Sequence, residues 1–140
     1  MPAHPFDLTG RRALVTGGGS GIGFAIAEGL AAAGAAVVIN GRNRAKLDAA
    51  VARLASAGHA VSACAFDVTD EAAVAAGVAQ IERAAGPLDI LVNNAAVNVR
   101  KPLPELTTAD WRALQAANVD GPFFVIRAVL PGMQARRCGK

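Results

Sequence analysis

Tyrosine and a cysteine framework are the most informative absences from this sequence. None of its 140 residues is tyrosine, so no phenol group of this chain donates or accepts a proton in catalysis. The two cysteines, Cys64 and Cys138, have neither a disulfide framework nor a metal-ligand spacing. Unpaired cysteines are typical of a reducing compartment, so we expect a cytoplasmic protein that binds no metal.

The sequence also lacks a base-stacking surface and a membrane-spanning segment. Aromatic residues make up only 4% of it, and the lysines and arginines behind its net charge of +3 are scattered. The longest apolar run, from Leu30 to Ile39, is interrupted by Gly34 and is too short to cross a bilayer. Residues 1–8 show neither the basic nor the apolar region of a signal peptide. We therefore expect neither a nucleic-acid partner nor a membrane partner.

Short apolar runs alternate with longer helical segments along the chain. We expect strands at residues 12–16, 36–40, 60–66 and 88–93, and helices at residues 21–33, 43–57, 70–85 and 107 to about 136. This alternation predicts a single α/β domain over residues 1–140, a Rossmann-like, doubly wound parallel sheet in three α/β/α layers. Such a fold needs about six strands. We therefore expect it to be truncated after the fourth strand and its following helix, with the C-terminal catalytic half absent.

Apolar spacing predicts how the first two helices pack, and local signals predict where helices begin and end. One face of the first helix should be formed by Ile22, Ala25, Ile26, Gly29 and Leu30, and the inward face of the second by Leu47, Ala50, Val51 and Leu54. Gly34 should end the first helix, Gly58 the second, and Gly86-Pro87 the third. Thr69 or Asp70 should cap the third helix, Thr107 and Asp110 have the spacing of a capping box, and Pro122 and Pro131 should kink or interrupt the last helix.

A glycine-rich turn, TGGGSGIG, occupies residues 16–23 between the first predicted strand and the first helix. Gly17 allows a tight turn, Gly21 lets the backbone approach a diphosphate, and Gly23 permits close contact between helix and strand. The helix amino end adds N–H donors and partial positive charge. A plain turn is the alternative, but this context favours a dinucleotide site with Gly17, Gly19, Ser20, Gly21, Ile22 and Gly23 as its residues.

The end of the second strand indicates which nicotinamide cofactor is bound. A carboxylate about 20 residues beyond the turn would bind the 2′-hydroxyl of NAD. Here the chain reads Asn40-Gly41-Arg42, and no acid stands between Glu28 and Asp48. A guanidinium grips a 2′-phosphate that a carboxylate would repel. The sequence therefore favours NADP over NAD, with a merely solvated Arg42 as the alternative.

These features together resemble the short-chain dehydrogenase/reductase family. The motif Thr-Gly-x-x-x-Gly-x-Gly at residues 16–23 is joined by Asp67-Val68 after the third strand, NNAA at residues 93–96 and Asn118. The resemblance runs from Phe6 to Lys140. It implies that Asp67 and Val68 contact the adenine, that Asn94, Ala95 and Ala96 border the cofactor, and that Asn118 is a catalytic-site asparagine. Ala96 stands where the family usually has glycine, and Gly41-Arg42 matches its NADP-preferring pattern.

The resemblance further implies hydride transfer between a nicotinamide cofactor and a small-molecule alcohol or carbonyl. In the family a tyrosine is the general acid/base, a lysine lowers its pKa and a serine positions the substrate. Tyrosine is absent here, and Ser20, Ser56 and Ser62 lie in the wrong segments. We therefore expect cofactor binding without activity from this chain alone. Asn118 would support the proton relay behind the lysine, unless it only bonds a kinked helix.

The sequence constrains the substrate less than it constrains the cofactor. FDLTGRRALVTG, VVINGRN and AFDVTD look like members that interconvert gluconate and 5-ketogluconate, although 3-oxoacyl carrier-protein reductases share these stretches loosely. Asn98, Arg100 and Lys101 follow the fourth strand, at the edge where open α/β sheets bind ligands. They would attract an acidic sugar, or they form only a solvated loop.

Features of the last helix and the fourth strand indicate that the chain binds another protein chain. We expect an open strand edge, and exposed apolar side chains at Phe123, Phe124, Ile126 and Val129. The resemblance implies a homo-oligomer formed through the helix from Thr107 to Arg136. The alternative to a reductase is a non-enzymatic module that binds a nucleotide or a partner subunit.

Overall fold

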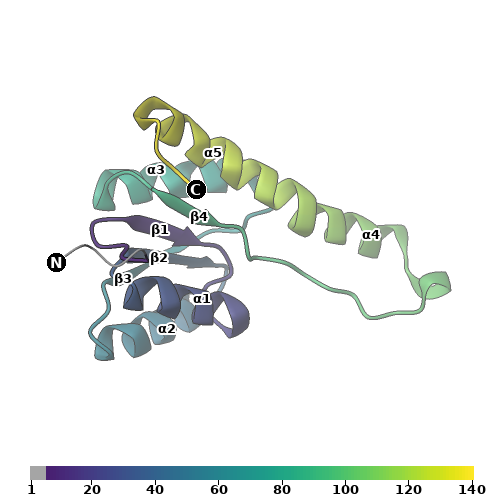
Figure 1. Ribbon diagram of the computed structural model, residues 1–140. Helices are drawn as coiled ribbons and strands as arrows, with labels where there is room; N and C mark the ends of the chain where they lie inside the picture. Colours follow the sequence, from purple (N-terminus) through teal and green to yellow (C-terminus); the bar gives the residue numbers. More distant parts are fainter. Residues whose placement is uncertain (1–5) are drawn as a thin grey trace.

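The computed structural model describes residues 6–140 and contains one parallel sheet (Figure 1). Its strands are β1 (Arg12–Val15), β2 (Ala36–Gly41), β3 (Val61–Ala65) and β4 (Ile90–Val92), in the spatial order β3-β2-β1-β4. β1 pairs with both β2 and β4, so the strand order reverses direction beside β1. In doubly wound sheets the ligand binds at this switch point, outside the carboxyl ends of the strands.

Helices cover both faces of the sheet, as predicted. α1 (Gly21–Ala32) and α2 (Arg44–Ser56) lie on one face, and α3 (Glu71–Ala85) and α5 (Gly121–Arg136) lie on the other (Figure 1). Alternate residues of the central strands supply the two cores: Val37 and Ile39 face α1 and α2, whereas Val38 faces α3 and α5. The α/β/α arrangement with β2 buried on both faces is therefore confirmed.

α1 packs with a different face from the one predicted. Its buried residues are Gly23, Phe24, Ala27 and Ala31. Of the predicted face, Ile26 and Leu30 are half-buried against the same core, whereas Ile22, Ala25 and Gly29 are exposed. Apart from Glu28, α1 consists of apolar residues and glycine, so periodicity does not determine its rotation. The rotation of α1 is set instead by the close contact of Gly23 with Gly17 and Asn94. In α2, Leu47, Ala50 and Leu54 are buried as predicted, and Val51 is half-buried.

Most predicted helix ends are confirmed. The Asp70 side chain, rather than Thr69, caps α3 by accepting a hydrogen bond from Ala73 N. Gly34, Gly58 and Gly86 all have positive φ angles at the ends of their helices. Thr107 and Asp110 form the capping box of α4 (Thr108–Gln115).

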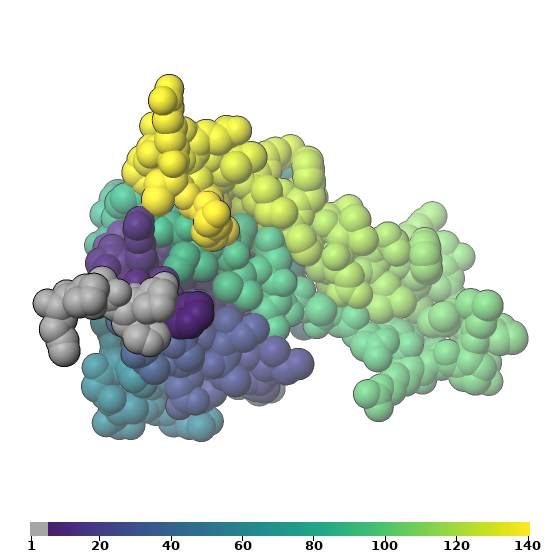
Figure 2. Space-filling model, viewed as in Figure 1, coloured from purple at the N-terminus to yellow at the C-terminus, as the bar shows by residue number. Residues whose placement is uncertain are grey.

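The predicted last helix is divided into two helices. α4 is followed by a π-helical turn, η2 (Ala116–Asp120), and then by α5. Pro122 lies in the first turn of α5, directly after this interruption, but Pro131 lies inside α5 without ending it. α4 and the short 3₁₀ turn η1 (Leu103–Glu105) project away from the sheet as an arm (Figures 1 and 2). Phe123 and Ile126 are exposed as predicted, but Phe124 is half-buried and Val129 packs into the α3–α5 core.

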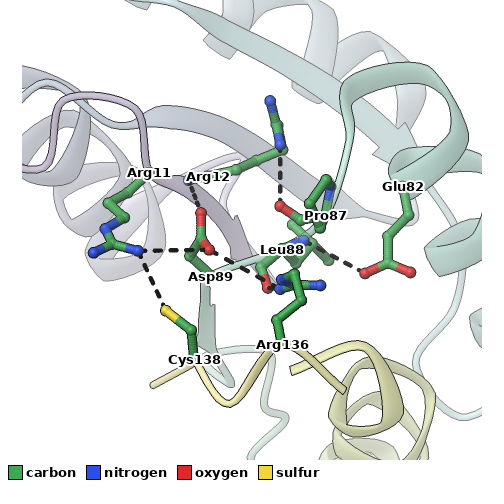
Figure 3. Close-up of polar contacts among 8 residues, drawn as sticks. All are labelled: Arg11, Arg12, Glu82, Pro87, Leu88, Asp89, Arg136 and Cys138. Carbon is green, nitrogen blue, oxygen red and sulfur yellow. Dashed lines mark hydrogen bonds and ion pairs between the residues drawn. The ribbon is translucent and has the colours of Figure 1, made fainter. Parts of the chain in front are cut away.

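Asp89 joins the sheet to the last helix at the amino ends of the strands (Figure 3). Its Oδ2 accepts a hydrogen bond from Arg12 N at 3.0 Å, and its Oδ1 lies 3.9 Å from Arg11 Nη1 and 4.0 Å from Arg136 Nη2. Arg136 also donates to Leu88 O at 2.6 Å. β4 is an edge strand of the sheet, as predicted, but Lys140 bonds the backbone of Asp89 and Leu91 on its outer side, both at 2.9 Å.

Candidate functional site

The glycine-rich turn is built from backbone that tolerates no side chains at key positions. Gly17 and Gly21 have φ angles of +64° and +54°, a region that favours glycine. A Cβ on Gly23 would overlap the Gly17 carbonyl oxygen and Asn94 Nδ2. A Cβ on Gly18 would lie 2.7 Å from Ile39 Cγ2. The turn therefore lies tight against β2 and the loop after β4.

Thr16 and Asn94 connect this turn to the segment after β4. The buried Thr16 Oγ1 accepts hydrogen bonds from Asn94 N and Ala95 N, both at 3.0 Å. Asn94 Nδ2 donates to Thr16 O at 3.0 Å and to Gly17 O at 3.3 Å. Asn94, predicted as a cofactor contact, thus uses its amide group to hold the turn. Thr16 was not predicted as a site residue, although it is the polar residue that directly follows an apolar strand.

Asn40 makes the equivalent connection between β2 and the end of β3. Its buried Nδ2 donates to Cys64 O at 3.1 Å and to Phe66 O at 3.0 Å. Its backbone carbonyl accepts from Gly18 N at 2.9 Å. Its Oδ1 has no partner among residues 6–140, so it remains an unsatisfied acceptor beside the site. Asn40 was not predicted either, and the only signal in the sequence is one amide side chain at the end of an apolar run.

Asp67 lies opposite Arg42 after β3. Its Oδ1 accepts hydrogen bonds from Thr69 N at 2.9 Å and Thr69 Oγ1 at 2.8 Å, and its Oδ2 lies 3.8 Å from Arg42 Nη1. Partial burial would raise the pKa of this carboxyl, but the Thr69 hydrogen bonds and the Arg42 charge together lower it. Asp67 is therefore an anion at neutral pH.

These segments surround a cavity of about 270 Å³ at the carboxyl edge of the sheet. Predicted site residues that line it are Gly17, Ser20, Arg42, Asp67, Val68, Asn94, Ala95 and Ala96. Gly19 lines a smaller neighbouring hollow. Gly21, Ile22 and Gly23 line neither cavity: Gly23 packs under the turn, and Ile22 is 75% exposed.

Asn118 lies in the π-helical turn η2 and holds the loop after β4. Its Oδ1 accepts from Val97 N at 2.9 Å, and its Nδ2 donates to Val97 O at 3.0 Å. Val97 and Ala117 line the cavity, whereas Asn118 does not. Asn118 thus bonds a distant backbone segment rather than its own helix, and its catalytic role stays a prediction.

Lys101 is not available as a substrate cation in this structure. Its Nζ lies 2.8 Å from Asp110 Oδ2, and this bond, followed by those from Thr107, lowers the pKa of Asp110 to about 2. Arg100 is exposed and makes no ion pair with another residue in the 6–140 range. Of Arg100 and Lys101, only Arg100 has a positive charge that no Asp or Glu within residues 6–140 neutralises.

Residues 6–140 contain no group of three or more His, Cys, Asp or Glu side chains arranged to hold a metal ion. None of the helices in that part of the chain is long and apolar enough to cross a membrane. Burial raises the pKa of the Cys64 thiol, which packs in the core.

The residues of the cavity fit a dinucleotide. The turn brings backbone close to the space where a diphosphate would lie, and α1 points its amino end toward it. Arg42 adds a cation at the end of β2, and Asn40 contributes an unsatisfied buried acceptor. Backbone N–H donors and positive charge suit the phosphates of such a ligand, and the apolar side chains of the lining suit its adenine ring.

The family model described as short chain dehydrogenase matches residues 11–140. Gluconate 5-dehydrogenase of Gluconobacter oxydans is 50% identical over 140 residues, which are 99% of this chain and 55% of that protein. The chain thus spans about half the length of the curated relatives it matches.

Solved structures are also similar to this chain in both fold and sequence. A gluconate 5-dehydrogenase from Burkholderia cenocepacia, in complex with NADP and tartrate, has a TM-score of 0.90 and 45% identity over 97% of this chain and 55% of that one. A 3-oxoacyl (acyl-carrier-protein) reductase from Agrobacterium tumefaciens with NADP bound has a TM-score of 0.89 and 38% identity, covering 96% of this chain and 52% of that one.

Proposed function

Because the chain belongs to the short chain dehydrogenase family, we propose that it forms the cofactor-binding part of an NADP(H)-dependent oxidoreductase. The observation that carries this proposal is the cavity at the switch point of the sheet, with the glycine-rich turn on one side and Arg42 and Asp67 on the other. The two related structures in complex with NADP support the choice of cofactor.

The chain's own residues bind and orient the cofactor in this proposal. The backbone of residues 17–23 and the amino end of α1 hold the diphosphate, Arg42 holds the 2′-phosphate, and Asp67 and Val68 border the adenine. When bound, the nicotinamide supplies or accepts the hydride. Asn118 keeps Val97 and the loop after β4 in place beside the nicotinamide end.

We propose gluconate and 5-ketogluconate as the substrate pair of the whole enzyme. Gluconate 5-dehydrogenases are among the proteins most similar to this chain in both sequence and structure. The substrate is an anion, and Arg100 is an exposed cation on the loop after β4, at the ligand-binding edge of the sheet. A 3-oxoacyl carrier-protein reductase is the second candidate, because such an enzyme is also among the structural relatives.

A binding experiment tests the cofactor assignment. Calorimetric titration of the purified protein should give a much lower Kd for NADPH than for NADH, and Arg42→Ala should remove most of that difference while leaving NADH binding nearly unchanged. Equal affinities of the unaltered protein for the two dinucleotides would contradict the assignment to NADP.

A turnover assay tests the role of this chain in the chemistry. Because it contains no tyrosine, we expect the purified 140-residue protein to oxidise no NADPH above background with 5-ketogluconate. Measurable reduction of 5-ketogluconate by this protein would show that another group handles the proton.

We also propose that the protein's macromolecular partner is a second copy of the same chain. Trp111 and Val119 are exposed before α5, and Phe123, Ile126 and Leu130 are exposed along it. A row of large apolar side chains of this kind is typical of a surface covered by another subunit.

A further inference from the structure

The segment after β3, residues 66–69, forms one wall of the main cavity. β3 ends at Ala65, so this wall lies beyond the part of the chain that pairs with β2. The bonds from Thr69 to Asp67 Oδ1 lie within the segment itself. Its ion pair with Arg42 spans 3.8 Å at an exposed position and is weak. The position of the wall therefore depends on its contacts with other elements.

Apolar packing holds two side chains of this wall. Phe66 and Val68 are buried in the core beneath α3 and α5. A Cβ on Gly77 would overlap Phe66 Cδ1, so the Phe66 ring lies directly against the backbone of α3. A Cβ on Gly121 would lie 3.0 Å from Val68 Cγ2. Apolar packing has no preferred direction, so a directional contact is needed to fix the main chain between these side chains.

Asn40, at the end of β2, supplies the directional contact. Its Nδ2 donates to Phe66 O at 3.0 Å and to Cys64 O at 3.1 Å. No other side chain within residues 6–140 donates a hydrogen bond to the wall from outside it. The Asn40 backbone carbonyl also accepts from Gly18 N at 2.9 Å. One residue thus joins the glycine-rich turn to the wall formed by residues 66–69.

An amide at this position breaks the apolar pattern of β2. Asn40 follows Val37, Val38 and Ile39 and is only 1% exposed. Because its nitrogen faces two carbonyls, its Oδ1 is left without a partner within residues 6–140, and an unsatisfied buried acceptor destabilises the fold. Residues that break a local rule in this way are typical of functional sites. Stability alone therefore does not account for Asn40.

We propose that Asn40 is a positioning residue for recognition of the cofactor's base: its Nδ2 fixes the main chain at Phe66 and so places the Asp67 carboxylate. The inference rests on the proposed function, which puts Asp67 and Val68 beside the adenine. Adenine presents an amino group, a hydrogen-bond donor that suits a carboxylate. Hypoxanthine presents a carbonyl oxygen at the same place, which a carboxylate repels. The placement of Asp67 therefore sets the preference for adenine over hypoxanthine.

Calorimetric titration with NADPH and with its analogue that carries hypoxanthine in place of adenine tests the inference. The unaltered protein should bind NADPH at least about fivefold more tightly than the analogue, since a donor to a carboxylate is replaced by an acceptor. Asn40→Leu has a similar size and removes both donors. It should lower this ratio of affinities about threefold or more, because the carboxylate is no longer held in place.

Asn40→Thr is a milder variant that keeps one hydroxyl donor. Its ratio should lie between those of the unaltered protein and Asn40→Leu. It keeps the test decisive if the leucine variant does not fold, and circular dichroism verifies the fold of each variant.

Thr16→Val is the matched control. Thr16 is also 1% exposed, directly follows a neighbouring strand and bonds the backbone of Asn94 and Ala95 through its side chain. Its substitution loosens the glycine-rich turn and not the wall at residues 66–69. It should therefore weaken both dinucleotides by a similar factor and leave their ratio within about twofold of that of the unaltered protein.

Hydrogen exchange gives a second measurement that needs no ligand. The amides of Thr69 and Asp70 are bonded to Asp67 in the unaltered protein. Their exchange should become faster in Asn40→Leu and not in Thr16→Val, since only the first variant releases the wall.

The outcomes separate this inference from the proposed function. If the unaltered protein binds neither dinucleotide, the proposed function fails and this inference fails with it. If it binds both equally well, or if the Asn40 variants weaken both by the same factor as Thr16→Val does, the dinucleotide site stands and the role of Asn40 in base recognition is wrong.

Discussion

Single residues at this site act mainly by holding backbone in place. Thr16 and Asn94 use their side chains to join the glycine-rich turn to the end of β4, and Asn40 uses its side chain to join β2 to the end of β3. Each of these hydrogen bonds contributes about 1 kcal/mol, and more where its loss leaves a buried group unsatisfied. The shape of the cavity therefore depends on residues that offer few groups to a ligand.

Gly23→Ala should disrupt the site at this scale. The new methyl group would overlap Gly17 O and Asn94 Nδ2, so the turn or α1 must shift. We expect about 1–3 kcal/mol of destabilisation and loss of NADPH binding. Thermal unfolding and calorimetry measure the two effects.

The control for this substitution lies in the same helix. A Cβ added to Gly29 would meet no atom within 4 Å outside its own turn of α1, and the φ angle of Gly29 is not positive. Gly29→Ala should therefore be neutral or stabilising by up to about 1 kcal/mol. If the two alanine variants were equally stable, the tight contact at Gly23 would not matter.

Among the elements, the arm formed by η1 and α4 has the least support from packing. No residue of α4 is buried, so its start depends on local polar contacts. Asp110 accepts hydrogen bonds from Thr107 N and Oγ1 and pairs with Lys101. Helices without a buried face are marginal, and caps decide whether they form.

The capping box predicts a pH dependence for α4. Folding lowers the pKa of Asp110 from 3.8 to about 2, so its stabilising effect is full above about pH 4 and is lost as the pH falls toward 2. Asp110→Asn should abolish this contribution. Helix content followed by circular dichroism from about pH 5 to about pH 2 should fall less steeply in the variant than in the unaltered protein; identical curves would argue against the assignment.

At the scale of the whole molecule, the exposed apolar face from Trp111 to Leu130 should mediate self-association. Light scattering after size exclusion should give a mass above that of one chain. Phe123→Ser should shift the distribution toward the monomer, because it removes an exposed aromatic contact from the centre of that face.

Ile22→Ser is the corresponding control. Ile22 is also exposed, but it lies on α1, across the sheet from α5. Its substitution should leave the mass distribution unchanged. A monomeric unaltered protein, or equal effects of the two substitutions, would remove the argument for a second copy on this face.

The sequence by itself determined the order of strands and helices, the helix caps and the place of the glycine-rich turn. These depend on neighbours along the chain: apolar periodicity, glycine conformations and side chains that bond within a few residues, as at Asp70 and Thr107. The predicted residues Arg42 and Asp67 also line one cavity, because the carboxyl ends of parallel strands meet at one edge.

Only the tertiary structure decided the rotation of α1, the burial of Val129 and the contacts of Asn40 and Asn118. Apart from Glu28, α1 consists of apolar residues and glycine, so its buried face depends on what Gly23 touches in the turn. Asn40 and Asn118 bond backbone more than twenty residues away, at Cys64, Phe66 and Val97. Local sequence patterns carry no information on such contacts, because the contacts form only when strands pair and helices pack.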